Sequence, residues 1–238
     1  MTRFGQSDDL RGAEFAEASL KGARFVECDL TDMVMRGVDI GGTDIDAPWL
    51  AEAGASLIVN GVEVAPYVQA ELDRRFPGRA DRRAEDPDGL RAAWAAAEKA
   101  WSAARDRAAS MPDGTVDASV DGEWSFAQTQ RHLVHATDLW FGRSILESED
   151  FHPVGLSYGA TSTDNPPYAD VLEARAGRVA RVRDFLATVT PAELDKARTS
   201  PHGPRSVTTR SCLHVILGEE WEHLRFATRD LDTLAAGN

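Results

Sequence analysis

The chain has 238 residues, 42% of them hydrophobic, and carries a formal net charge of −13. This length can bury one sizeable core beside a smaller unit, so one or two domains are expected. The acidic balance, without any Lys/Arg cluster longer than a dipeptide, excludes an electrostatic footprint for nucleic acid, and we expect no binding to DNA or RNA. With only Cys28 and Cys212 and no long apolar run, the sequence predicts a cytoplasmic protein without a disulfide framework or a membrane segment.

Near the N-terminus an apolar residue returns at every fifth position, a period that neither a helix nor a flat strand has. These positions are Leu10, Phe15, Leu20, Phe25, Leu30, Met35, Ile40 and Ile45. A second, largely small or apolar set stands two places before each, with Asp8 as the exception, and comprises Ala13, Ala18, Ala23, Cys28, Met33, Val38 and Thr43. This double period of five resembles the pentapeptide-repeat family.

The resemblance implies that residues 1–46 coil into a short right-handed square β-helix with one repeat on each face. Eight repeats would give about two coils, which is short for a solenoid because each coil covers its neighbour and the ends need caps. The alternative is an irregular loop that happens to repeat. Some pentapeptide proteins mimic DNA and bind topoisomerases, but two coils offer little surface for that. A structural cap on the following domain is therefore favoured.

Residues 47–85 form the predicted connector. Apolar β-branched residues flank Asn60-Gly61, the dipeptide typical of a two-residue turn, so a short hairpin is expected there. A short helix is expected over 67–76, because a Pro-Gly dipeptide follows it. The charged stretch 78–88 predicts an exposed linker.

Residues 86–238 predict four long helices. The first carries a bundle-type seam with apolar residues at alternating steps of four and three, at Leu90, Trp94, Ala97, Trp101, Ala104, Ala108 and Met111. The second opens at Ser125 with a capping box to Gln128 and is expected to reach about Glu149. The third begins after Pro167.

The remaining elements follow from capping signals and from proline. Thr190 opens a second capping box, which predicts a single-turn helix. The stretch 198–210 contains two prolines and a glycine and predicts a loop. The fourth long helix is expected from about Thr208 to about Ala235, where Gly237 stops it.

Two ionisable residues of the fourth helix, Glu219 and His223, stand four apart on its core-facing side, and His132 lies on the apolar side of the second helix. Burying an unpaired carboxylate is costly, so these side chains need a partner. One carboxylate and two imidazoles suit a divalent ion and leave at least one coordination position open, which is typical of a catalytic site. Zinc, nickel, iron and manganese all fit these ligands. Without an ion, the alternative is a core His132 hydrogen-bonded to Glu219.

The motifs around this site are Glu123-Trp124-Ser125, Arg131-His132-Leu133, Cys212-Leu213-His214-Val215 and Glu219-Glu220-Trp221-Glu222-His223. On these motifs, residues 86–238 resemble the DinB-like superfamily of metal-binding four-helix bundles, whose members include mycothiol-dependent maleylpyruvate isomerase and the bacillithiol S-transferases. The resemblance implies one divalent metal, zinc foremost, held by His132, Glu219 and His223. Many members have histidine at the position of Glu219, whereas the isomerase has glutamate there. The whole chain is thus expected to be mainly α, with a short pentapeptide β-helix before the bundle.

Other candidate residues have weaker support. Glu220 is the candidate catalytic base beside the metal ligands, although Glu220 and Glu222 are both expected on the flanks of the helix. His135 and His214 are expected in supporting or packing roles, and Cys212 is expected to be a buried, inert thiol. His152 and His202 lie in loops that could line the mouth of the site.

Two functions from different classes follow. The first is an enzyme in which the metal activates a low-molecular-weight thiol, mycothiol in an actinobacterium, for S-transfer to a small electrophile or for its thiol-assisted isomerisation. The isomerase's own reaction is not expected, since its catalytic arginine comes from a further domain without a counterpart in these 238 residues. The second is a non-catalytic scaffold that binds a ligand or partner, with a structural metal or none. The sequence leaves the oligomeric state open, a homodimer included.

Overall fold

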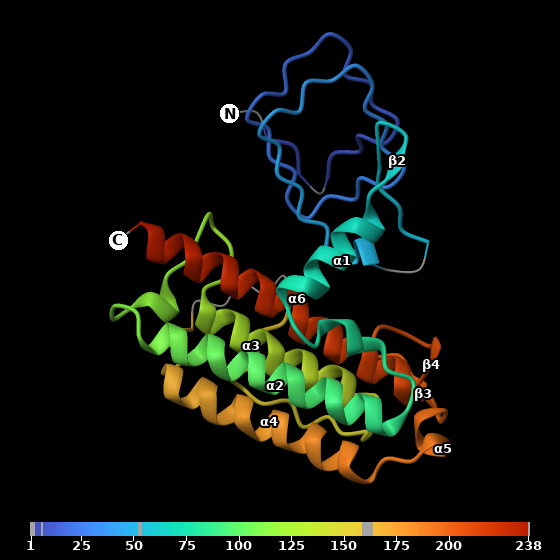
Figure 1. Cartoon of the computed structure of the whole chain (residues 1–238), viewed down its shortest axis with the longest axis vertical. Coiled ribbons are helices and arrows are strands. Elements are labelled where there is room, and N and C mark those ends of the chain that lie inside the picture. Colours follow the sequence, from blue (N-terminus) through green and yellow to red (C-terminus); the bar gives the residue numbers. More distant parts are fainter. Residues whose placement is uncertain (1–2, 6, 52–53, 159–163, 238) are drawn as a thin grey trace. The chain divides into compact units, whose positions relative to one another are not determined.

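The computed structural model describes residues 3–5, 7–51, 54–158 and 164–237. The chain forms two compact units, Met1–Asp46 and Ala47–Asn238. Figure 1 shows that long helices dominate the second unit, which agrees with the predicted mainly α class. No described helix is long and apolar enough to cross a membrane.

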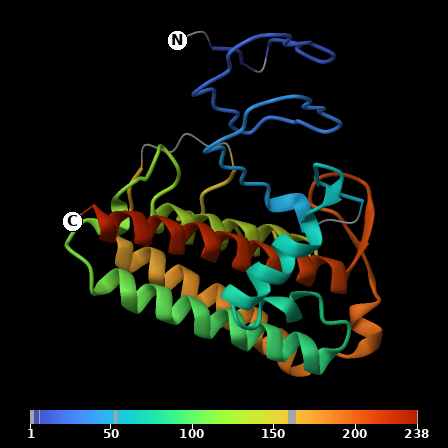
Figure 2. The same cartoon turned by 45° about the horizontal axis from the view of Figure 1, so that its top comes forward.

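In the first unit, the backbone turns with the predicted period of five. Positive φ angles recur at every fifth residue from Gly12 to Gly42, and the non-glycine corners are Glu17, Glu27 and Asp32. At every second corner a backbone hydrogen bond closes the turn, as from Ala13 N to Leu10 O at 3.0 Å. The successive turns of this unit are visible in Figure 2. Within its described residues no strand is assigned, so the regular feature is the corner and not a β-ladder.

The apolar residues at the centres of the repeats remain half-exposed. Their exposed fractions run from 40% at Leu30 to 56% at Phe15 and Phe25. Each coil of a solenoid is covered by the coils before and after it, and so short an array leaves its inward-facing residues open. Among its described residues, this unit therefore has no buried core.

The second unit opens with the predicted hairpin and short helix. A 3-10 turn, η1 (Pro48–Ala51), precedes strands β1 (Ile58–Val59) and β2 (Val62–Glu63), which pair antiparallel. Asn60 and Gly61 both adopt positive φ angles, as a tight two-residue turn requires. Helix α1 (Ala65–Arg75) follows.

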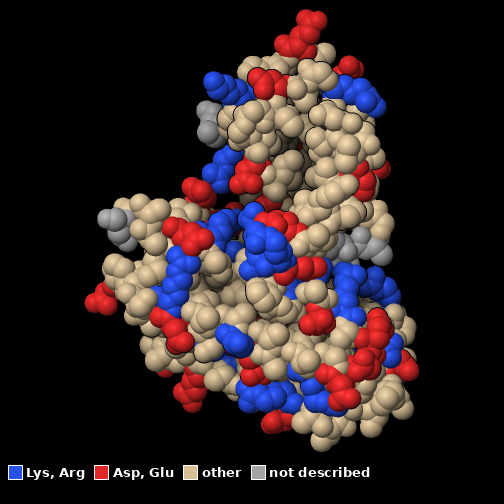
Figure 3. All heavy atoms as spheres, viewed as in Figure 1, with Lys and Arg blue, Asp and Glu red and all other residues tan. Residues whose placement is uncertain are grey.

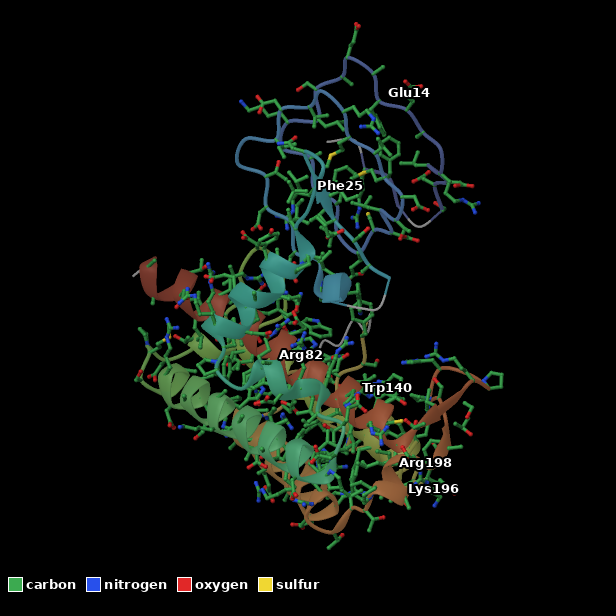
Figure 4. All side chains as sticks on the ribbon, turned by 45° about the vertical axis from the view of Figure 1, so that its right-hand side comes forward. Glu14, Phe25, Arg82, Trp140, Lys196 and Arg198 are labelled. Atoms are coloured by element: carbon green, nitrogen blue, oxygen red, sulfur yellow. The ribbon has the colours of Figure 1, made fainter. Side chains whose placement is uncertain are left out.

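The predicted exposed linker over 78–88 is wrong in its first half. A 3-10 helix, η2 (Arg79–Arg83), packs on the bundle, and the side chain of Arg79 is only 1% exposed. Its guanidinium contacts Asp73 at 2.5 Å, Gln69 at 2.8 Å and Glu222 at 3.1 Å. Arg82, labelled in Figure 4, donates to the Arg79 carbonyl at 3.1 Å. Arg79 is therefore buried because its guanidinium finds acceptors in Gln69, Asp73 and the distant Glu222, whereas Ala80, Asp81 and Arg83 of this stretch remain exposed as expected.

Four of the described helices pack against one another and form the bundle: α2 (Pro87–Ala109), α3 (Phe126–Thr137), α4 (Tyr168–Thr188) and α6 (Thr209–Ala236). Figures 1 and 2 show them side by side. The predicted seam of α2 is buried, as are Leu213, Ile216, Leu217, Trp221 and Leu224 of α6. The capping box at Ser125 is present, and Thr208 forms another with Ser211.

The second long helix does not run to Glu149 as expected. It ends at Thr137 and continues as a π-helix, η4 (Asp138–Arg143). Asp138 is buried, and its carboxylate accepts hydrogen bonds from Arg178 at 2.8 Å and from the backbone N–H of His152 at 2.9 Å. A widened turn shifts the side-chain phase, which an apolar period of 3.6 does not reveal. A short 3-10 turn, η3 (Thr115–Asp117), precedes α3.

The predicted loop 198–210 contains a small hairpin instead. The single-turn helix α5 (Pro191–Leu194) forms as expected, and strands β3 (Ala197–Thr199) and β4 (Ser206–Thr208) follow it. Arg198, labelled in Figure 4, is buried, contacts Glu193 and donates to Thr209 Oγ1 at 3.0 Å. Three-residue strands are too short for alternation to show in the sequence.

Over the visible face, Lys and Arg side chains lie among Asp and Glu (Figure 3).

Candidate metal centre

The structure brings the three predicted metal ligands together. Oε2 of Glu219 lies 3.3 Å from Nε2 of His132 and 3.1 Å from Nε2 of His223. One potential ligand atom from each residue lies within 4.8 Å of the other two. Among the described residues, this is the one group of three or more His, Cys, Asp or Glu with such spacing.

Two helices position these side chains. Glu219 and His223 are four apart on α6, so one stands above the other on the same face. His132 comes from α3, which packs against α6 and anchors itself through the buried Leu133 and Ala136. Packing of the two amphipathic faces therefore assembles the site.

Both ring nitrogens of His132 face oxygen atoms. Nδ1 lies 3.1 Å from the carbonyl oxygen of Leu156, and Nε2 lies 3.3 Å from the Glu219 carboxylate. A neutral imidazole has one N–H, so it can donate to only one of these two acceptors. If Nδ1–H donates to Leu156, the lone pair of Nε2 points toward a carboxylate oxygen. A cation bound between Nε2 and the carboxylate oxygen would remove the repulsion between these two electron-rich atoms. A backbone carbonyl that accepts from the other ring nitrogen is the usual support of a metal-binding histidine.

The distances between donor atoms also fit an ion. Two ligand atoms around a tetrahedral zinc ion lie about 3.3 Å apart, given Zn–N and Zn–O distances near 2.0 to 2.1 Å. The separations of 3.1 and 3.3 Å match that value. Burial would raise the pKa of Glu219, but hydrogen bonds from His132 and His223 outweigh it and lower the pKa to about 2. The carboxylate is thus ionised and available as a ligand at neutral pH.

The site is shielded but not closed. The side chain of His132 is 9% exposed and that of His223 15%, whereas that of Glu219 is 32% exposed. Part of the Glu219 side chain is therefore open to solvent at the triad, defined as His132, Glu219 and His223.

Aromatic rings surround the triad. The Trp124 ring lies 4.7 Å from the His132 ring and 6.1 Å from the His223 ring, between centroids, and the Tyr158 ring meets Trp124 edge-on at 6.2 Å. Phe226 meets His223 edge-on at 5.7 Å. Trp124 lies in the loop before α3 and Tyr158 in the loop after η4, where the sequence carries no periodic signal from which their places beside the triad could be predicted.

The segment around Leu156 is held onto α3 by backbone contacts. The Leu156 N–H donates to the Arg131 carbonyl at 3.1 Å, and the Arg131 guanidinium donates to the carbonyl of Val154 at 2.9 Å and to that of Asp164 at 2.7 Å. Arg131 immediately precedes His132 in the chain. The group that supports His132 is a backbone carbonyl, so residue types in the sequence cannot reveal it.

The candidate base Glu220 is not part of the triad. It is 2% exposed, so its expected place on the helix flank is wrong, and its carboxylate contacts the guanidinium of the buried Arg175. Burial raises the pKa of Glu220, while Arg175 acts in the opposite direction. Its backbone carbonyl accepts from Trp101 Nε1 at 3.2 Å. These contacts tie Glu220 to the core of the bundle.

The other candidates also lie outside the triad. For His214 the expected alternatives are core packing or a local hydrogen bond, but its Nε2 lies 2.9 Å from the Ala84 carbonyl oxygen, 130 residues away in the chain. His135 packs against Phe151, and burial lowers its pKa. His152 accepts a hydrogen bond from the Val154 N–H, and His202 packs edge-on against Trp140. Burial raises the pKa of Cys212 to about 11, in keeping with an inert thiol.

Comparison with known proteins identifies both parts of the chain. The family model described as the DinB superfamily matches residues 96–227, and eight copies of the pentapeptide repeat match residues 9–46. Both predicted family relationships are thereby confirmed. No curated protein and no solved structure gave a significant match. Since the DinB model covers more than half of the chain, this protein belongs to the DinB superfamily and has its metal-binding fold, with a pentapeptide-repeat unit at residues 9–46.

Proposed function

We propose that this protein is a divalent-metal-dependent enzyme that activates a low-molecular-weight thiol for S-transfer to a small electrophile or for its thiol-assisted isomerisation. The observation that carries the proposal is the convergence of His132, Glu219 and His223, of which Glu219 is the most exposed. A divalent ion bound there would lower the pKa of a thiol ligand, so that the nucleophilic thiolate persists near neutral pH.

The charges of the triad suit an anionic ligand. Glu219 contributes one negative charge, and the histidines are neutral when they act as ligands. The three side chains would therefore leave a divalent ion with net positive charge, which favours a thiolate over a neutral ligand. His132 cannot rotate away easily, because the Leu156 carbonyl holds its Nδ1.

The identities of the metal and the thiol are proposed on different grounds. Two nitrogens and one oxygen fit zinc best, and nickel, iron or manganese also accept this set. The thiol, of the mycothiol class, is proposed by analogy with thiol-using members of the superfamily, because a shared fold does not fix a substrate.

The test is a metal analysis of the purified protein followed by a thiol-consumption assay with monochlorobimane as electrophile. Every protein in the assay carries Cys28→Ser, because the exposed Cys28 thiol would itself react with monochlorobimane. We expect one metal ion per chain and multiple turnovers with mycothiol. His223→Ala should abolish both, since a ligand is lost. The matched control is His214→Ala on the same helix, which should keep metal and turnover.

A second candidate function is the non-catalytic scaffold. The observation that favours it is that the Glu219 carboxylate lies within hydrogen-bonding distance of Nε2 of both histidines, so it can accept from them without an ion when Nε2 carries the proton. Stoichiometric metal without turnover of any thiol, or no metal at all, would support the scaffold and contradict the enzyme.

A further inference from the structure

We infer that Trp124 and Tyr158 form an aromatic rim at the metal triad, and that this rim selects ligands in which the metal-binding atom is attached to a planar, unsaturated group. The inference rests on the proposed metal site and adds the class of ligand that this site prefers. Trp124 and Tyr158 are assigned as specificity-determining residues.

Trp124 lies against the metal ligands themselves. Its ring is tilted by 39° to the His132 ring at 4.7 Å and lies within 22° of parallel to the His223 ring at 6.1 Å. The backbone next to it is fixed, because Ser125 forms a capping box with Gln128 at the start of α3. The backbone from which the indole extends beside both imidazoles is therefore anchored to α3.

Tyr158 extends this aromatic surface into solvent. Its ring is 61% exposed and meets Trp124 edge-on, at 77° and 6.2 Å. Two residues earlier, Leu156 is tied to α3 through His132 and Arg131. Exposure thus falls from Tyr158 through the half-buried Trp124 to the buried His132, and the rings form a continuous path from solvent to the metal ligands.

Packing in the core does not account for these rings. Neither Trp124 nor Tyr158 belongs to either hydrophobic cluster found among the described residues, whereas Trp94, Trp101 and Trp221 do. A large exposed ring gains little by folding and can gain by covering a ligand. A planar group bonded to an atom at the metal would stack against the indole or meet it edge-on, and a saturated group of similar size would not.

The test measures ligand affinity without any turnover. The full-length chain is loaded with cobalt(II), and its visible absorption is followed during titration with 4-cyclohexylimidazole or 4-phenylimidazole, which offer the same nitrogen and differ in whether the attached six-membered ring is saturated or planar. We expect 4-phenylimidazole to bind about three- to tenfold more tightly, the range of one aromatic pair. Trp124→Leu should remove that preference with little change in the affinity for 4-cyclohexylimidazole. Tyr158→Leu should reduce the preference, and Trp124→Phe should keep part of it.

Trp49→Leu is the matched control, because Trp49 is 71% exposed and belongs to η1, away from the triad in the sequence. It should leave both affinities unchanged. A clear cobalt spectrum with equal affinities for the two ligands in the wild-type protein would contradict the role of the aromatic rim and leave the metal site standing. Survival of the preference in both Trp124→Leu and Tyr158→Leu would contradict the rim in the same way. Absence of a cobalt spectrum in the wild-type protein would overturn the metal site as well. If Trp124→Leu fails to bind cobalt, Tyr158→Leu and Trp124→Phe decide the outcome.

Discussion

Adjacent carboxylates on α6 occupy opposite environments. Glu219 lies between two imidazoles, is partly open to solvent and has a pKa lowered to about 2. Glu220 is buried, is paired with Arg175, and has a pKa raised by burial. One helical step of about 100° separates the two side chains. Because of this rotation, the Glu219 carboxylate belongs to the triad, whereas the Glu220 carboxylate links α6 to α4.

The buried ion pair predicts a large effect on stability. Glu220→Gln leaves the Arg175 guanidinium buried without a counter-charge and should lower the free energy of unfolding by about 3 to 5 kcal/mol. Replacing both partners with apolar residues, as in Arg175→Met with Glu220→Leu, should cost much less. Urea denaturation measures both changes. Equal losses in the single and the double variant would contradict the assignment of Glu220 to the core pair.

The cysteines should differ sharply in reactivity. Burial disfavours the charged thiolate and raises the pKa of Cys212 to about 11, so at pH 8 only about one molecule in a thousand carries the thiolate there. Iodoacetamide at pH 8 should therefore modify the exposed Cys28 and spare Cys212, as read by mass spectrometry. Reactivity of Cys212 should rise as the pH approaches 11, and in urea both thiols should react. Rapid native labelling of Cys212 would mean that the start of α6 opens locally.

At the scale of elements, the side chain of Arg79 links η2 both to α1 and to α6. Arg79→Met removes the contacts to Asp73, Gln69 and Glu222 and should cost about 2 to 3 kcal/mol in the free energy of unfolding. Arg75→Met is the control, because Arg75 is 63% exposed and pairs only with Glu71, so its loss should be within about 0.5 kcal/mol. Equal, small effects of both substitutions in thermal or urea unfolding would refute the role given to Arg79.

At the scale of the whole molecule, the second unit contains the entire buried core of the described residues. Every member of the two hydrophobic clusters lies beyond residue 46, and so do the three candidate metal ligands. A chain that begins at Ala47 should therefore fold cooperatively and bind metal with the affinity of the full chain. Circular dichroism and a metal titration test this expectation. A lost or weakened metal site after the deletion would mean that the pentapeptide unit contributes to it.

Much of this organisation follows from the sequence alone, because it depends on local periodicity. The step of five from Leu10 to Ile45 indicated the corners that recur from Gly12 to Gly42, and the alternation from Leu90 to Ala108 gave the buried seam of α2. The i, i+4 spacing of Glu219 and His223 placed two polar groups on one helical face. Capping residues indicated the starts of α3 and α5.

The tertiary structure decided what depends on partners distant in the chain. The burial of Arg79, the pairing of Glu220 with Arg175 and the pairing of the buried Asp138 with Arg178 each depend on a charged group from another segment. The Leu156 carbonyl behind His132 and the indole of Trp124 beside both imidazoles depend on how loops lie against α3. Local periodicity determines which face of a helix turns inward, but only packing determines which groups meet there, because contacts across the core carry no sequence spacing of their own.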